Sequence, residues 1–71
     1  MNEAITRIKY AIALRHTVYY RIYGKRISYR PTEIRYRYIN GEWRYFVELE
    51  DMRPHKNRSV VIVPLDEVEF E

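Results

Sequence analysis

Residues 33–51, EIRYRYINGEWRYFVELED, decide the fold that this sequence predicts. Apolar and charged side chains alternate on both sides of Asn40-Gly41, which is the pattern of a strand with one face toward a core. An Asn-Gly pair between two such runs is the strongest short signal for a hairpin, because both turn residues need a positive φ. The stretch therefore predicts two antiparallel strands, at about 33–39 and 42–50, joined by a tight turn.

The same alternation continues toward the N-terminus. Residues 17–23 and 25–30 predict two further short strands, with a turn at Gly24-Lys25 between them. Pro31 follows the second of these strands. Because proline cannot donate a ladder hydrogen bond, we expect it to end the strand or to sit at a sheet edge.

The two ends of the chain carry different patterns. In residues 2–15 the apolar side chains recur at helical spacing, which predicts an amphipathic helix. Residues 51–58 are typical of a polar loop, and the β-branched run at 59–63 predicts a fifth strand. A helix followed by about five short strands is expected to curl into a small barrel, because closure hides the strand edges. The predicted fold class is mainly β with one N-terminal helix.

The composition indicates one small domain, spanning residues 1–71. Cysteine is absent, which excludes a disulfide or a thiolate metal site. The apolar runs are shorter than the roughly 20 residues of a membrane span, and the charged N-terminus does not suit a signal peptide. A cytoplasmic location is therefore expected. Arginine outnumbers lysine ten to three and glutamine is absent, a composition compatible with a thermophilic source.

The charge is unevenly distributed along the chain. Residues 1–47 hold ten basic and three acidic side chains, giving +7, whereas residues 48–71 hold three basic and seven acidic ones, giving −4. Such asymmetry suggests an anionic partner for the basic part of the surface. The alternative is that the two parts neutralise each other across the fold.

The alternation also assigns tyrosines to the two faces of the sheet. Those that share a face with aliphatic residues are expected in the core, namely Tyr20, Tyr36, Tyr38 and Tyr45. Tyr19 and Tyr23 share a face with Arg21, so they are expected at the surface.

One set of residues follows a family pattern in order along the chain. Its members are Tyr20, Gly24, Pro31, the tripeptide Tyr45-Phe46-Val47, Asp51 and the closing stretch 63–68, VPLDEV. This order resembles the WYL domain, a small Sm-like β-barrel found mostly in bacterial transcriptional regulators, whose namesake tripeptide would stand at 45–47. The resemblance covers about residues 4–68, and it implies a five-stranded Sm-like or SH3-like barrel with a role in transcription regulation.

Two departures from the family pattern concern the ligand site. Val61 and Glu67 stand where the WYL domain carries arginines, the first of which contacts ligands in the family. The resemblance therefore supports the barrel more than any particular ligand.

The sequence does not predict an enzyme. It has no cysteine nucleophile, no glycine-rich phosphate loop and no paired metal-ligand spacing. His16 and His55 are far apart in sequence and are expected as separate surface histidines. Asp51, Asp66 and Glu67 are expected to balance arginines rather than to act as an acid and a base. No catalytic residue, cofactor or metal site is therefore expected.

A basic and aromatic strand face is the candidate site. Arginine grips phosphate with two parallel hydrogen bonds, and exposed aromatic rings provide stacking platforms for single strands. The candidate nucleic-acid-binding residues are Tyr19, Arg21, Tyr23, Arg26, Arg30, Arg35, Arg37 and Arg44. They predict a non-enzymatic nucleic-acid-binding or regulatory domain, with single-stranded DNA or RNA as the partner.

Two other interpretations of that face remain open. It can be a solvated surface on which Glu33, Glu42 and Glu48 pair with the arginines. The protein can also be an interaction or oligomerisation module, with or without ligand sensing, that docks on a larger protein or on its own copies. In the second case the acidic residues 66–71 would meet the basic face of a neighbouring copy.

Overall fold

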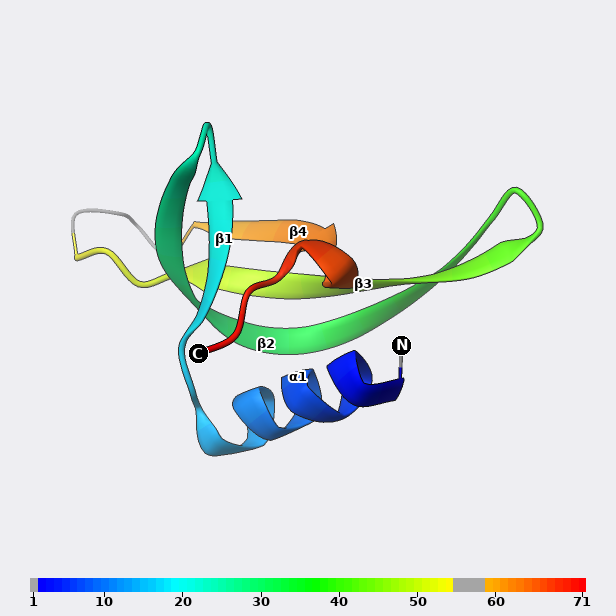
Figure 1. Ribbon diagram of the computed structural model, residues 1–71, viewed down its shortest axis with the longest axis horizontal. Coiled ribbons are helices and arrows are strands. Elements are labelled where there is room, and N and C mark those ends of the chain that lie inside the picture. Colours follow the sequence, from blue (N-terminus) through cyan, green and yellow to red (C-terminus); the bar gives the residue numbers. More distant parts are fainter. Residues whose placement is uncertain (1, 55–58) are drawn as a thin grey trace.

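The structure, a computed structural model, describes residues 2–54 and 59–71. This part of the chain is mainly β, with an N-terminal helix and a four-stranded antiparallel sheet (Figure 1). In chain order the elements are α1 (Asn2–Leu14), β1 (Val18–Ile22), β2 (Lys25–Ile39), β3 (Glu42–Asp51), β4 (Val60–Pro64) and the 3₁₀ turn η1 (Leu65–Glu67).

The sheet has the strand order β1-β2-β3-β4. The described residues form four strands and not the predicted five, because the predicted strands 25–30 and 33–39 are one continuous strand, β2. A bulge just after Pro31 shifts the β2–β3 register and carries the strand past the proline. Pro31 lies beyond the last β1–β2 pair, Val18–Tyr29, where β2 has a strand partner on one side only. Of the two positions expected for Pro31, the end of a strand is wrong, because β2 continues past it, and a place where the strand has one free side is confirmed.

The predicted barrel is not confirmed, because the four-stranded sheet stays open. After β4 the chain turns through η1, and Glu69 then forms an isolated bridge to Tyr19 on the free edge of β1. The two backbone N–H···O distances of this bridge are 2.8 and 2.9 Å. The C-terminal segment therefore returns to the first strand without extending into a fifth.

The helix α1 packs against β2 and closes one side of the core (Figure 1). Its Ile8 and Ala11 are buried, together with Val18, Tyr29, Val47, Leu49, Val63, Leu65 and Val68. The helix ends at Leu14, where Arg15 takes a φ of 58° and reverses the chain. In the described part of the chain, no helix is long and apolar enough to cross a membrane.

Both hairpin turns use residues with positive φ. Asn40 and Gly41 have φ values of 50° and 80°, which confirms the predicted turn. The first hairpin turns at Tyr23 and Gly24, with φ values of 51° and 78°, one residue earlier than the predicted Gly24-Lys25. Tyr23 is fully exposed, and a bulky side chain in this backbone conformation is strained.

The β2–β3 hairpin is longer than the strands that flank it. β1 covers β2 only as far as Tyr29, and β4 covers β3 only from Phe46 onward. Residues 36–45, here called the arm, therefore pair only with each other and extend beyond the rest of the sheet (Figure 1). The arm lies along the longest dimension of the molecule, 40 Å against 24 and 21 Å.

The arm explains which tyrosine predictions fail. Tyr36, Tyr38 and Tyr45 lie on the core face of the sheet, as the alternation predicted, because Ile34 pairs with Val47 on that face. The expected burial of Tyr36 and Tyr38 is nevertheless wrong, since they are 54% and 63% exposed. No described element covers the arm on that side.

Other tyrosines occupy the core itself. Tyr29 is only 1% exposed, and its ring meets that of Tyr20 in an edge-to-face contact with 6.4 Å between centroids. Tyr20 and Tyr45 are half-buried and pack against the core, in agreement with their assignment. The burial of a tyrosine therefore depends on how far the neighbouring strands extend as well as on the face of the sheet that it occupies.

Replacing Tyr29 by alanine should destabilise the protein far more than the same change at Tyr36. The first change empties a buried site and should cost about 3–5 kcal/mol. The second removes an exposed ring with one edge-to-face partner and should cost about 1 kcal/mol or less. Urea unfolding of both variants measures the difference. Equal losses would contradict the assignment of Tyr29 to the core and of Tyr36 to the arm.

Tyr23→Asn should stabilise the protein by about 0.5–1 kcal/mol, because asparagine tolerates positive φ better than tyrosine does. Asn40→Tyr, the reverse change at the corresponding position of the other hairpin, should destabilise it by a similar amount. Thermal unfolding of both variants tests the pair. A loss of stability in Tyr23→Asn would mean that the tyrosine ring makes a stabilising contact.

Candidate nucleic-acid interface

All six predicted arginines lie on one face of the sheet, here called the basic face. Strand alternation and register place them opposite the core face, and they are Arg21 of β1, Arg26, Arg30, Arg35 and Arg37 of β2, and Arg44 of β3. Two pairs are direct cross-strand neighbours, Arg21 with Arg26 and Arg37 with Arg44. Tyr19 shares the basic face, whereas Tyr23 lies in the turn beyond β1.

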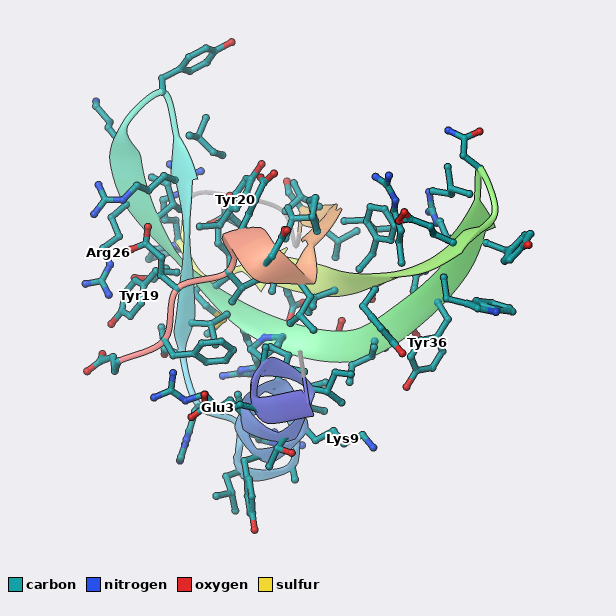
Figure 2. All side chains as sticks on the ribbon, turned by 45° about the vertical axis from the view of Figure 1, so that its right-hand side comes forward. Glu3, Lys9, Tyr19, Tyr20, Arg26 and Tyr36 are labelled. Carbon is teal, nitrogen blue, oxygen red and sulfur yellow. The ribbon has the colours of Figure 1, made fainter. Side chains whose placement is uncertain are left out.

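The basic face is divided into two groups at opposite sides of the molecule. Figure 2 shows Tyr19 and Arg26 together on one side and Tyr36, at the base of the arm, on the other. The predicted residues are therefore not one continuous site.

The first group is covered by the C-terminal segment and is called the capped cluster: Tyr19, Arg21 and Arg26 with Glu69 and Glu71. The Glu69 carboxylate lies 2.7 Å from Arg21 Nε and 3.2 Å from Arg26 Nε, so one acid serves both arginines. The Arg26 guanidinium also stacks 3.8 Å from the centre of the Tyr19 ring. The Tyr19 hydroxyl donates a hydrogen bond to Glu71. Each side chain of this cluster thus has a partner within the chain.

The carboxylates also change the chemistry of Tyr19. Its hydroxyl donates to Glu71, and this hydrogen bond raises the pKa of Tyr19 above the ordinary value. The acidic tail, which the sequence left free for a neighbouring copy, therefore contacts the basic face of its own chain. The contact agrees with the alternative that the basic and acidic parts of the chain neutralise each other across the fold, although the pattern did not predict which residues would meet.

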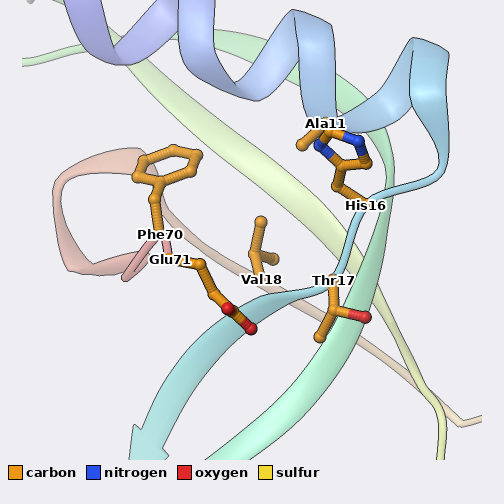
Figure 3. Close-up of a pocket in the computed structure, with 6 residues that line it drawn as sticks. All are labelled: Ala11, His16, Thr17, Val18, Phe70 and Glu71. Atoms are coloured by element: carbon orange, nitrogen blue, oxygen red, sulfur yellow. The ribbon is translucent and has the colours of Figure 1, made fainter.

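A pocket of about 370 Å³ lies beside the capped cluster, between the end of α1, the start of β1 and the C-terminal segment (Figure 3). Its lining residues are Ala11, His16, Thr17, Val18, Phe70 and Glu71. His16 is exposed on this wall, while His55 lies outside the described residues. The described residues include no group of three or more side chains suited to holding a metal ion.

Between the two groups, Arg35 is neutralised as the salt-bridged interpretation predicted. Its Nη2 donates a 3.0 Å hydrogen bond to Glu48. Its Nε lies 2.8 Å from Glu33, close enough for an ion pair but not aligned for a hydrogen bond. Hydrogen bonds from the Thr32 hydroxyl and from Arg35 lower the pKa of Glu48. Glu42, the third predicted partner, forms no ion pair within residues 2–54 and 59–71.

The second group, on the arm, is not neutralised. Arg37 and Arg44 lie directly opposite each other, and neither has a carboxylate at ion-pair distance in the described chain. The Arg37 guanidinium lies 5.0 Å from the centre of the Phe46 ring, which orients it on the surface. Like charges directly across a strand pair are destabilising. The arm therefore holds two positive charges that an anionic ligand would neutralise.

The opposite face of the arm carries aromatic rings that strand alternation places on the core face of the sheet. Tyr36 and Tyr38 are joined there by Trp43, which is 65% exposed. The sequence did contain one indication that these rings would be exposed. The predicted strands of the second hairpin are longer than the predicted strand at 59–63, so they cannot be flanked along their whole length. Strand length identifies the side chains that extend beyond the neighbouring strand only once the strand order is known.

Glu69→Gln should lower the melting temperature by about 1–5 °C at low salt and by less at high salt. The change keeps the backbone bridge to Tyr19 but leaves Arg21 and Arg26 facing each other without a shared carboxylate, and salt screens the resulting repulsion. Glu67→Gln is the matched control, because Glu67 is exposed and forms no ion pair among the described residues. Identical melting curves for the two variants at low salt would contradict the role of Glu69.

Comparisons of the chain with models of protein families, with curated proteins and with solved structures found no match. The resemblance to the WYL domain therefore rests on the residues quoted for it.

Proposed function

We propose that the protein is a non-enzymatic nucleic-acid-binding domain that contacts the phosphate backbone with Arg37 and Arg44 of the arm. The observation that carries this proposal is the unneutralised cross-strand pair of arginines on a projecting hairpin. The guanidinium fork matches phosphate oxygens, so a phosphate between the two side chains would replace repulsion by two charge-assisted contacts.

The charge distribution favours a polyanion over a small anion. Residues 1–47 carry a net charge of +7 from the sequence, and within the described residues Arg37 and Arg44 form no ion pair with the acidic C-terminal segment. A backbone of regularly spaced phosphates gains from such an extended positive surface, mainly by releasing its counterions. The capped cluster contributes less, because Glu69 already neutralises Arg21 and Arg26.

We also infer a relation to small Sm-like barrels of the WYL type and a cytoplasmic role in regulation. The returning C-terminal segment supports this inference, since the Tyr19–Glu69 bridge is the kind of contact through which an open sheet approaches closure.

The double variant Arg37→Ala/Arg44→Ala should bind single-stranded oligonucleotides more weakly than the unmodified protein. The slope of log K against log salt should also fall by about 1.4, because each lost phosphate contact on a single strand contributes about 0.7. Fluorescence anisotropy with labelled DNA and RNA oligonucleotides, at several salt concentrations, measures both quantities.

The matched control is Arg21→Ala/Arg26→Ala, which removes the same charge from the capped cluster. It should change the affinity and the salt slope much less, since these arginines are already paired with Glu69. Equal losses in the two double variants would show that net charge matters and the arm does not. Absence of binding by the unmodified protein at low salt would reject the proposal.

A protein-interaction or oligomerisation module is the second candidate. The observation that favours it is on β4, the last strand in the sheet order, where Val60 and Ile62 are exposed. An apolar strand at a sheet edge is a template for pairing with another chain. This candidate would replace the first if the protein fails to bind nucleic acid and its mass in light scattering rises with concentration.

A further inference from the structure

The aromatic face of the arm is a second exposed surface with its own geometry. Tyr36, Tyr38 and Trp43 are 54%, 63% and 65% exposed, and the β2–β3 register places them side by side with the half-buried Tyr45. Large aromatic side chains gathered on one exposed surface usually mark a binding site. This face lies directly behind Arg37 and Arg44, on the other side of the same two strands.

The rings are arranged so that flat surfaces stay open. Tyr36 meets Tyr45 at 80° between planes with centroids 4.9 Å apart, and Tyr38 meets Trp43 at 62° and 5.4 Å. In such an edge-to-face pair, each ring covers only a part of its partner. Each pair therefore holds its rings in place and still presents ring faces to a planar ligand.

A pocket at the edge of the arm connects the two faces. β4 ends its pairing at Phe46, so the outer edge of β3 is open from Glu42 to Tyr45. A pocket of about 380 Å³ forms there, and its lining includes the acidic residues Glu42 and Asp66 as well as the neighbours Trp43 and Arg44. Because these neighbours point to opposite faces of the sheet, a ligand that crosses this edge meets an aromatic ring and a guanidinium group together.

We propose that the arm binds single-stranded nucleic acid, with unpaired bases stacked on Trp43 and Tyr38 and the adjoining phosphates held by Arg37 and Arg44. This inference rests on the proposed function and specifies its ligand. The surface combines flat apolar rings with unneutralised positive charge. The rings match the flat face of a base, and the charge matches the phosphate next to it. Bases in a duplex cover one another's faces, whereas unpaired bases leave theirs free to stack on side chains.

The test compares a labelled oligothymidylate of about 12 nucleotides with an abasic phosphodiester chain of the same length. The unmodified protein should bind the oligothymidylate more tightly. Trp43→Ala/Tyr38→Ala should weaken oligothymidylate binding about 5- to 100-fold and leave abasic binding unchanged. Trp43→Phe should keep most of the affinity, because it keeps a ring. Arg37→Ala/Arg44→Ala should weaken the binding of both chains.

The control variant for the loss of an exposed ring is Tyr10→Ala. Tyr10 is 64% exposed on α1 and lies outside the arm, so the change should leave both affinities unaltered. Trp43 provides an independent signal, because it is the only tryptophan in the chain. Its fluorescence should be quenched by the oligothymidylate and not by the abasic chain.

Several results would overturn the inference. Equal affinity for the two chains would leave phosphate binding intact and reject base stacking. Tighter binding to a duplex than to its separated strands would also reject it. A change in Trp43 emission with protein concentration alone would show that a second copy covers the aromatic face. If neither chain binds, the proposed function fails and the inference fails with it.

Discussion

The register between β2 and β3 is the constraint on which the rest of the structure depends. Asn40 and Gly41 both take positive φ, and the tight turn that they form sets which residue of β2 lies opposite each residue of β3. Side chains alternate between faces, so a slip by one residue would move every apolar side chain of one strand to the solvent side. The same register that pairs the buried Val47 with Ile34 therefore places Arg37 opposite Arg44.

Differences in strand length turn this one register into three environments. Where β1 and β4 flank the central strands and α1 packs on the sheet, the core face is buried. Beyond them, the same face becomes an exposed row of aromatic rings. On the basic face, the C-terminal segment neutralises one group of arginines and leaves the other open. The candidate site is thus the part of the hairpin for which the described chain provides neither a cover nor a counter-charge.

The sequence was sufficient for the features that depend on local pattern. Helical spacing located α1 to within one residue, and strand alternation placed the arginines on one face. It was insufficient where an outcome depends on distant segments. The burial of Tyr36 depends on how far β1 and β4 reach, and the pairing of Arg21 depends on where Glu69 returns. The strand break predicted at Pro31 is wrong for a local reason, because a bulge lets one strand continue where two were expected.

The bridge between Tyr19 and Glu69 has a consequence for the order in which the molecule assembles. The β1–β2 and β2–β3 pairings join neighbours in sequence, so they close short loops at a small entropic cost. The bridge joins the first strand to the C-terminal segment, across all the other strands in sequence, and gains nothing until the intervening sheet exists. We therefore expect it to form late and to open before the rest of the sheet. Amide hydrogens at this bridge should then exchange sooner than those of the β2–β3 pairing, and each opening would separate Tyr19 from the acids that cover it.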